Sequence, residues 1–208
     1  TLLVHHGQPL YTELHLERMA LGLQALALPD CLTAARRQLN SAANAAAQKK
    51  WPWAVLRLSV LRGSGSRGYA PSVNSSPRIL ICVSSLDRDC GQMATAATLC
   101  VAAIRLSTQP LLAYIKHLNR LEQVLAAAQA QAEDADECVI LDQTGHLTSV
   151  AAGNIFLVRH GELLTPKLEN CGVLGTRRRL IIERGAPSIG LKVREVRLTF
   201  ADLQNAEQ

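Results

Sequence analysis

Residues 111–125 read LLAYIKHLNRLEQVL, and one lysine, Lys116, stands in them between an apolar run and an amphipathic segment. The apolar residues of that segment recur at the spacing of an α-helix, which predicts a helix that begins just after the lysine. They are Leu118, Leu121, Val124, Leu125 and Ala128. The pattern predicts that this stripe packs into the core and that Lys116 is directed inward.

Lys116 has two interpretations. A lysine in apolar surroundings loses the hydration of its charged form, so its amine becomes available as a nucleophile or a base. Such an amine is what Schiff-base chemistry with pyridoxal phosphate (PLP) requires. In the other interpretation the aliphatic stem packs while the ammonium group reaches water. Spacing alone leaves both open.

Composition bounds the class of protein. The chain has 208 residues, of which 48% are hydrophobic and 19% charged, so it can form one large domain or two small ones. The formal net charge is +5, which suits small anionic substrates as well as nucleic acid. The sequence contains no helix-turn-helix, zinc-finger or RNP pattern, so we expect no nucleic-acid partner.

Cysteine and histidine usage argues against metal and disulfide chemistry. The six cysteines form no C-x-x-C pair, and they are predicted to be reduced, mostly buried thiols. The histidines form no H-E-x-x-H motif, so no metal site is expected. No apolar run is long enough to cross a bilayer and the start resembles no signal sequence, which predicts a soluble cytoplasmic protein.

The remaining elements follow from periodicity and turn residues. A hairpin is predicted around His5 and His6, followed by a helix that Thr12 caps and a second helix over residues 32–50. Strands are predicted at residues 53–62, 78–83, 99–106, 137–141, 146–150, 154–159, 162–164 and 191–198, and helices at 176–183 and after Thr199. A composition shift predicts an N-terminal subdomain at residues 1–107, a linker at 108–115 and a C-terminal subdomain at 116–208.

The run IKHLNRLEQVLA at residues 115–126 resembles the active-site segment of the class IV, D-amino-acid-aminotransferase-like PLP enzymes. This resemblance implies an α+β, two-subdomain fold of type IV. It also implies that Lys116 bonds to the cofactor and later moves a proton at the substrate α-carbon. Measured against the family, the first strand and the C-terminal part are expected to lie outside this sequence.

Two motifs in the first half extend the resemblance. Residues 15–19, HLERM, are similar to the family's H-x-x-R-[LM] helix, which implies that Arg18 holds the cofactor phosphate. The alternative is a surface arginine paired along its own helix. Residues 62–69, RGSGSRGY, resemble a loop of the aminodeoxychorismate lyase branch, and Arg67 would there bind a substrate carboxylate.

Three consecutive arginines at residues 177–179 open a predicted helix, an unfavourable place for positive charge unless an anion binds there. The alternative is a basic helix start exposed to solvent. Residues 172–178 resemble the family's G-V-x-G-x-x-R segment, which implies that the amides of Thr176 and Arg177 bind the PLP phosphate.

The segment TSVAAGN at residues 148–154 is similar to the family's T-E-x-x-x-x-N. Asn154 would contact the ring hydroxyl, but Ser149 stands where the glutamate facing the ring nitrogen is expected. Serine offers that nitrogen only a neutral hydrogen bond, so transamination should suffer more than an elimination driven by aromatisation.

The resemblance therefore implies a lyase that converts 4-amino-4-deoxychorismate, a small anionic substrate, to 4-aminobenzoate and pyruvate in folate biosynthesis. A homodimer is expected from the family. Two alternatives stay open, namely a class IV aminotransferase acting on D- or branched-chain amino acids and a catalytically degenerate relative.

Overall fold

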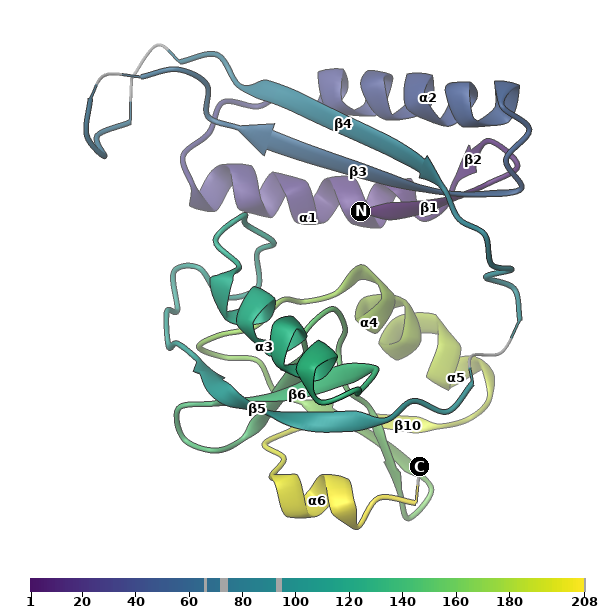
Figure 1. The fold of residues 1–208 in the computed structure, drawn as a ribbon, viewed down its shortest axis with the longest axis vertical. Helices are drawn as coiled ribbons and strands as arrows, with labels where there is room; N and C mark the ends of the chain where they lie inside the picture. Colours follow the sequence, from purple (N-terminus) through teal and green to yellow (C-terminus); the bar gives the residue numbers. More distant parts are fainter. Residues whose placement is uncertain (66, 72–74, 93–94, 208) are drawn as a thin grey trace. The chain divides into compact units, whose positions relative to one another are not determined.

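The computed structural model describes residues 1–65, 67–71, 75–92 and 95–207, and it divides the chain into two compact units, Thr1–Ala94 and Thr95–Gln208 (Figure 1). Helices and sheets occur in both units, as the α+β prediction requires. The division precedes strand β5 (Leu99–Leu106), whereas the predicted linker at residues 108–115 follows it. The reason is that β5 pairs with β6 (Glu137–Asp142) and so joins the second unit. Among the described residues, no helix has the length and apolar character that crossing a membrane requires.

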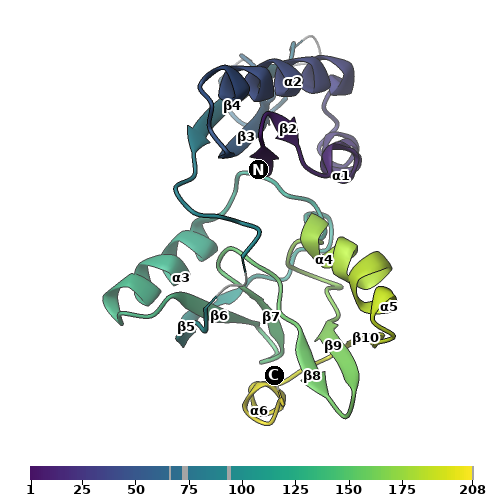
Figure 2. The same ribbon diagram turned by 90° about the vertical axis from the view of Figure 1, so that its right-hand side faces the viewer.

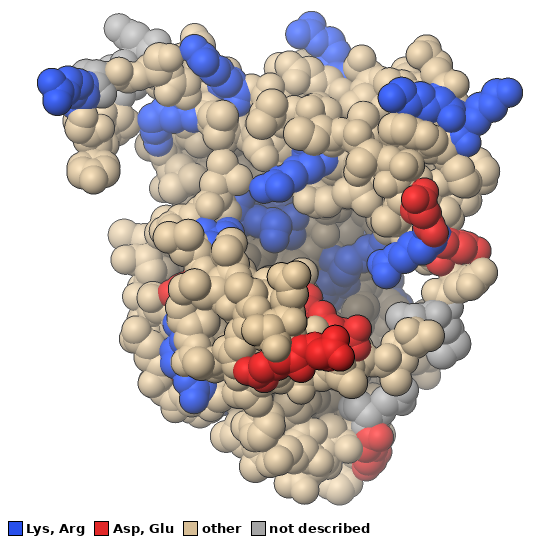
Figure 3. Space-filling model, in the orientation of Figure 1, with Lys and Arg blue, Asp and Glu red and all other residues tan. Residues whose placement is uncertain are grey.

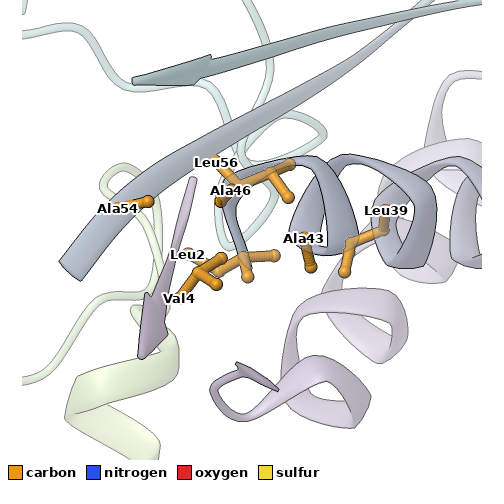
Figure 4. Packing of buried hydrophobic residues seen from close by; sticks show 7 residues of the cluster. All are labelled: Leu2, Val4, Leu39, Ala43, Ala46, Ala54 and Leu56. Atoms are coloured by element: carbon orange, nitrogen blue, oxygen red, sulfur yellow. The ribbon is translucent and has the colours of Figure 1, made fainter. Parts of the chain in front are cut away.

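The first unit is an antiparallel sheet covered by a helix. Its strand order is β2-β1-β3-β4, formed by Gln8–Pro9, Leu2–His5, Trp53–Leu61 and Arg78–Ser85. Helix α2 (Leu32–Gln48) packs on this sheet, and Figure 4 shows the apolar contact. Alternate strand residues meet helix residues three or four apart, as the periods of the two elements dictate. The cluster consists of Leu2, Val4, Leu39, Ala43, Ala46, Ala54 and Leu56.

Helix α1 (Thr12–Ala25) is tied to α2 by a bidentate ion pair. The Arg36 guanidinium donates to both carboxylate oxygens of Glu13, at 2.5 and 2.7 Å. The prediction that Thr12 caps α1 is wrong. The N-cap is Tyr11, at φ 55°, and the Thr12 hydroxyl instead donates to the Pro9 carbonyl at 3.4 Å.

Strand β6 is the centre of the second unit because it is buried on both faces. Its side chains alternate between two apolar clusters, with Cys138 and Ile140 in one and Val139 and Leu141 in the other. The first cluster lies under helix α3 (Leu121–Ala132), and the second joins β6 to β7 (Leu147–Val150), β8 (Leu157–Arg159) and β9 (Glu162–Pro166).

Two parallel strand pairs give the second unit its topology. β5 pairs with β6, and β9 pairs with β10 (Lys192–Val196), each in parallel register. Parallel neighbours require a crossover connection. Helix α3 lies in the first crossover, and the second contains α4 (Thr176–Leu180), a π-helical turn (Ile181–Gly185) and α5 (Ala186–Ser188), as Figures 1 and 2 show. The helix predicted to end at residue 183 therefore continues to Ser188.

The last helix, α6 (Phe200–Gln204), begins as predicted. The Thr199 side chain accepts a hydrogen bond from the Asp202 amide, and the Asp202 carboxylate accepts one from the Thr199 amide at 2.8 Å. This reciprocal capping box satisfies two main-chain donors at the helix start. The predicted Thr199 cap is confirmed.

The prediction for the lysine helix is wrong in its start and in its buried face. Helix α3 begins at Leu121, and Lys116 lies outside it. The predicted apolar stripe is exposed, including Leu121 at 71%, whereas Ala126 and Ala130 face the sheet. Residues four apart share a helix face, and these two small side chains let α3 approach β5 and β6 closely. The exposed residues are Leu118, Leu121, Val124, Leu125 and Ala128.

The cysteines are less buried than predicted. All six are free thiols, but only Cys138 and Cys171 are buried. Cys100 lies opposite Cys138 in the parallel register, and their sulfur atoms are 2.8 Å apart. Burial, reinforced by this contact, raises the pKa of Cys138 to about 12, so that thiol stays protonated at neutral pH.

Positive charge is scattered over the face in Figure 3, whereas negative charge is gathered. Basic side chains are dispersed over each unit, in agreement with the even charge pattern of the sequence. Acidic side chains gather where α3 ends and β6 begins, a stretch that contains Glu133, Asp134, Asp136 and Glu137.

We expect Ile140→Ala to lower the free energy of unfolding by about 2–5 kcal/mol, because it leaves a cavity under α3 in a fully buried position. Ile189→Ala is the matched control, since Ile189 is exposed in the same unit, and we expect a change of at most about 0.5 kcal/mol. Urea unfolding of both variants measures the difference. Equal losses would contradict the central role of β6.

Candidate active site

Lys116 lies in the connection that leaves the carboxyl end of β5, a place where ligands bind in sheets with parallel strands. The residues around it alternate in burial. Ala113 and Ile115 are each 4% exposed, whereas Tyr114 and Lys116 are exposed. Lys116 was predicted to be directed inward, and this prediction is wrong, because its side chain is exposed on the surface of the second unit. Tyr114 adopts a left-handed backbone conformation, at φ 73°, so the chain turns here rather than continuing as a strand, and Lys116 reaches the surface next to the buried Ile115.

Main-chain hydrogen bonds attach the lysine segment to the crossover that follows β9. The Tyr114 amide donates to the Gly172 carbonyl at 3.1 Å, and the Leu174 amide donates to the Tyr114 carbonyl at 3.3 Å. These bonds form a parallel bridge between Tyr114 and Val173. The Tyr114 hydroxyl adds a bond to the Glu169 carbonyl at 2.9 Å. Lys116 is therefore held near the start of α4, although about 60 residues separate them in sequence.

Asn154 belongs to the same cluster. Its Nδ2 donates to the Val173 carbonyl at 3.0 Å. A Cβ atom on Gly175 would lie 2.1 Å from Asn154 Oδ1, which is closer than any side chain can tolerate. Glycine at this position therefore lets the N-cap of α4 approach the asparagine amide, and the structure brings Asn154 to the predicted phosphate-binding helix.

Ser149 lies in β7, paired with Ile140 of the central strand, and is 9% exposed. Its neighbour Thr148 donates from its hydroxyl to the Ile140 carbonyl at 2.7 Å, which fixes the strand. A hydrogen bond from the Val150 amide to the Gly153 carbonyl, at 3.0 Å, closes the turn between Ser149 and Asn154. The two predicted ring-contacting residues thus flank one tight turn.

The arginines at the start of α4 have different surroundings. Arg178 is 5% exposed and donates to Glu195 Oε2 at 2.7 Å and to the Pro166 carbonyl at 3.2 Å. Arg179 donates from Nε to Glu183 Oε1 at 2.8 Å. These carboxylates balance two of the three charges, so the basic run alone does not require an anion.

Thr176, the first residue of α4, is buried, and Arg177 is exposed. Both stand at the helix start, as predicted, and their role in phosphate binding stays a prediction. The contribution of Arg178, which fastens α4 to β9 and β10, was missed by the sequence interpretation because Glu195 lies far along the chain.

Arg18 lies in α1 of the first unit and is half-buried. Its predicted phosphate contact stays a prediction. Arg67 is exposed in the loop between β3 and β4, and Ser66 of the same motif lies outside the described residues. Within the described parts of the chain, no three histidine, cysteine, aspartate or glutamate side chains are grouped as metal ligands.

Comparison with known proteins agrees with this arrangement. The family model "Amino-transferase class IV" matches residues 1–208. Aminodeoxychorismate lyase of Vibrio harveyi is 32% identical over 211 residues, which cover 100% of this chain and 75% of that protein. The crystal structure of 4-amino-4-deoxychorismate lyase from Pseudomonas aeruginosa matches with a TM-score of 0.86 and 35% identity, over 99% of this chain and 74% of that chain.

A hypothetical aminotransferase from Mycobacterium tuberculosis, solved in its PLP-bound form, matches with a TM-score of 0.83 over 99% of this chain and 73% of that chain. At 21% identity this likeness concerns the fold. The predicted α+β fold of type IV is confirmed, and the chain spans about three quarters of the length of these relatives.

Gly175→Ala tests the contact between α4 and Asn154. The added Cβ must displace the asparagine amide from the Val173 carbonyl, and we expect the free energy of unfolding to fall by about 1–3 kcal/mol. Gly185→Ala is the control, because its Cβ meets nothing closer than 3.9 Å. We expect that variant to be unchanged or up to about 1 kcal/mol more stable. If urea unfolding shows the same loss in both, the close approach has no energetic role.

Proposed function

The chain belongs to the amino-transferase class IV family, and from this membership we propose that it is a PLP-dependent lyase that converts 4-amino-4-deoxychorismate to 4-aminobenzoate and pyruvate. The observation that carries the proposal is the bridge between Tyr114 and Val173, which brings the lysine segment to the start of α4. The choice of lyase is supported by the names of two relatives that are 32% and 35% identical and by serine at position 149.

The side chains of the second unit fit the chemical groups of PLP. The cofactor has an aldehyde, a ring hydroxyl, a ring nitrogen and a phosphate, and when bound it supplies an electron sink for charge at the substrate α-carbon. Lys116 would hold the aldehyde and Asn154 the ring hydroxyl. The buried Ser149 hydroxyl would face the nitrogen. Thr176 and Arg177 are the phosphate ligands that we propose in this unit, and Arg18 of the first unit is proposed as a further one from the H-x-x-R-[LM] motif.

Lys116 has two tasks in this proposal. Its amine would hold the cofactor aldehyde and, when free, would move a proton at the substrate α-carbon. Both tasks need an amine that can reach a bound ligand. Its exposure on the surface of the second unit leaves the side chain accessible to a ligand.

Ser149 decides which reaction the site favours. A carboxylate at this position would keep the ring nitrogen protonated, whereas a neutral hydroxyl favours the unprotonated ring. Loss of pyruvate from this substrate is driven by formation of an aromatic ring, so it tolerates a weaker electron sink than transamination does. The lyase is therefore favoured over an aminotransferase acting on D- or branched-chain amino acids.

The proposal includes a homodimer in the cytoplasm. The exposed apolar residues of α3 and of the turn before it, among them Leu121, Val124 and Leu118, support a partner surface, because monomers rarely leave such residues together in water. Arg67, exposed in its loop, is proposed to bind a carboxylate of the anionic substrate. Sedimentation of the protein tests the dimer.

Lys116→Ala tests the covalent role of the lysine. After incubation with PLP and reduction with borohydride, we expect peptide mass mapping to find the cofactor on Lys116 of the natural protein. The variant should lack it and lose about 10²–10⁴-fold in the rate of 4-aminobenzoate formation. Lys192→Ala, which alters an exposed lysine, is the control and should behave as the natural protein. Absence of the cofactor from Lys116 in the natural protein would refute the proposal.

Ser149→Glu separates the lyase from its alternatives. A charge-assisted hydrogen bond to the ring nitrogen contributes about 1.5–3 kcal/mol, which corresponds to roughly 10- to 100-fold faster amino transfer from an amino donor. Lyase activity should change less. Ser149→Ala is the matched control and should gain no amino transfer. If lyase activity is found only in Ser149→Glu, the natural chain is a catalytically silent relative.

A further inference from the structure

The backbone around Lys116 needs support from outside regular structure. Residues 116–120 belong to neither a helix nor a strand, so regular main-chain hydrogen bonding does not fix the backbone at Lys116. On the N-terminal side the bridge at Tyr114 supplies two hydrogen bonds. The backbone on the C-terminal side of Lys116 needs a separate support.

Arg120 provides that support through its guanidinium group. Its Nη2 donates to the Ile115 carbonyl at 3.0 Å, and its Nε donates to the His117 carbonyl at 3.2 Å. The two acceptors lie one residue before and one residue after Lys116. A planar guanidinium has donors in a fixed fork, so contacts with both carbonyls fix their separation and orientation. A lysine ammonium has no such fork.

The surroundings of Arg120 strengthen these bonds. It lines a cavity of about 190 Å³ together with Ala113, His117, Glu122 and Cys171. Burial lowers the pKa of the Arg120 guanidinium and the nearby Glu122 carboxylate opposes that change, so the group keeps its charge at neutral pH. Hydrogen bonds from a charged donor shielded from water are stronger than those on an open surface.

His117, whose carbonyl is the C-terminal side of the clamp, has a neutral imidazole at neutral pH. Burial, followed by the charge of Arg120, lowers the pKa of His117. Within the described residues its Nδ1 is buried with no hydrogen-bond partner, as is Oε1 of Gln123 on the same cavity. The Nδ1 atom of His117 therefore anchors nothing, whereas Arg120 holds this turn through the carbonyls of Ile115 and His117.

We infer that Arg120 is a positioning residue for Lys116. By clamping the carbonyls of residues 115 and 117, it fixes the direction in which the lysine side chain leaves the backbone. The inference rests on the proposed function, in which the Lys116 amine must meet both the cofactor and the substrate α-carbon. Displacing a reacting group by about 1 Å can cost roughly 10²-fold in rate, so even a small backbone release should be visible.

Site-specific proteolysis tests the clamp without cofactor. Endoproteinase Lys-C cleaves after lysine only where the backbone can open, so cleavage after Lys116 reports on the clamp. In Arg120→Gln we expect this cleavage to be at least about tenfold faster, with cleavage after Lys167 and Lys192 unchanged. Arg105→Gln, which alters an exposed arginine in β5, is the matched control. A uniform increase at all three lysines, or none at Lys116, would overturn the inference.

Enzyme kinetics distinguish the donor geometry of the Arg120 guanidinium from its positive charge. We expect Arg120→Lys to lower kcat by about 10²-fold while KM stays within about threefold, because substrate binding does not depend on the direction of Lys116. Turnover restored to the natural rate in Arg120→Lys would show that charge alone matters and would overturn the clamp. Cofactor attachment to Lys116 of the natural protein tests the proposed function separately, since the proteolysis result does not depend on it.

Discussion

The hydrogen-bonded bridge between Tyr114 and Val173 is the constraint on which the candidate site depends. Each crossover of the second unit leaves the carboxyl end of a strand, and without a link the two connections would be free to diverge. Two main-chain hydrogen bonds provide about 0.5–1.5 kcal/mol each, which is modest. They join two segments that lie outside the named strands. Because they involve backbone groups, the link does not depend on particular side chains at positions 114 and 173.

Side-chain contacts then refine what the bridge brings together. The carbonyl of Val173 accepts from Asn154, and Gly175 allows the asparagine to lie against the start of α4. Arg178 fastens the same helix to Glu195 and to the end of β9. The helix start, the asparagine and the lysine segment thereby share one support, and moving any of them would disturb the others.

Sequence periodicity predicted the elements well and their surroundings less well. The strand at residues 99–106 and the Thr199 cap were predicted correctly because both depend on local signals. The buried face of α3 was not, since an apolar stripe shows which residues avoid water but not which surface covers them. Ala126 and Ala130 give little apolar signal, yet they are the residues small enough to approach the sheet.

In the candidate site, too, residues with a local sequence signal were predicted, and the side-chain contacts that support them were not. The lysine, the asparagine and the glycine-containing helix start were identified from a motif resemblance, and the structure brings them together. The partners of Arg178 and Arg120 could not be identified in this way. One pairs with a carboxylate 17 residues away, and the other donates to main-chain carbonyls, which carry no sequence signature.

This division of supports explains how the chemistry could change while the placement of the lysine stays the same. Ser149 is held by β6 and β7, through a strand whose contacts lie in the apolar clusters. Lys116 and the start of α4 are held by the bridge and by Arg120. In the proposed function, exchanging a carboxylate for a hydroxyl at position 149 would therefore alter what the ring nitrogen meets without altering the groups that position the amine. In the proposed function, the residue that would face the ring nitrogen and the residues that would position the amine belong to separate parts of the same unit, so a change at one buried position leaves the placement of the lysine intact.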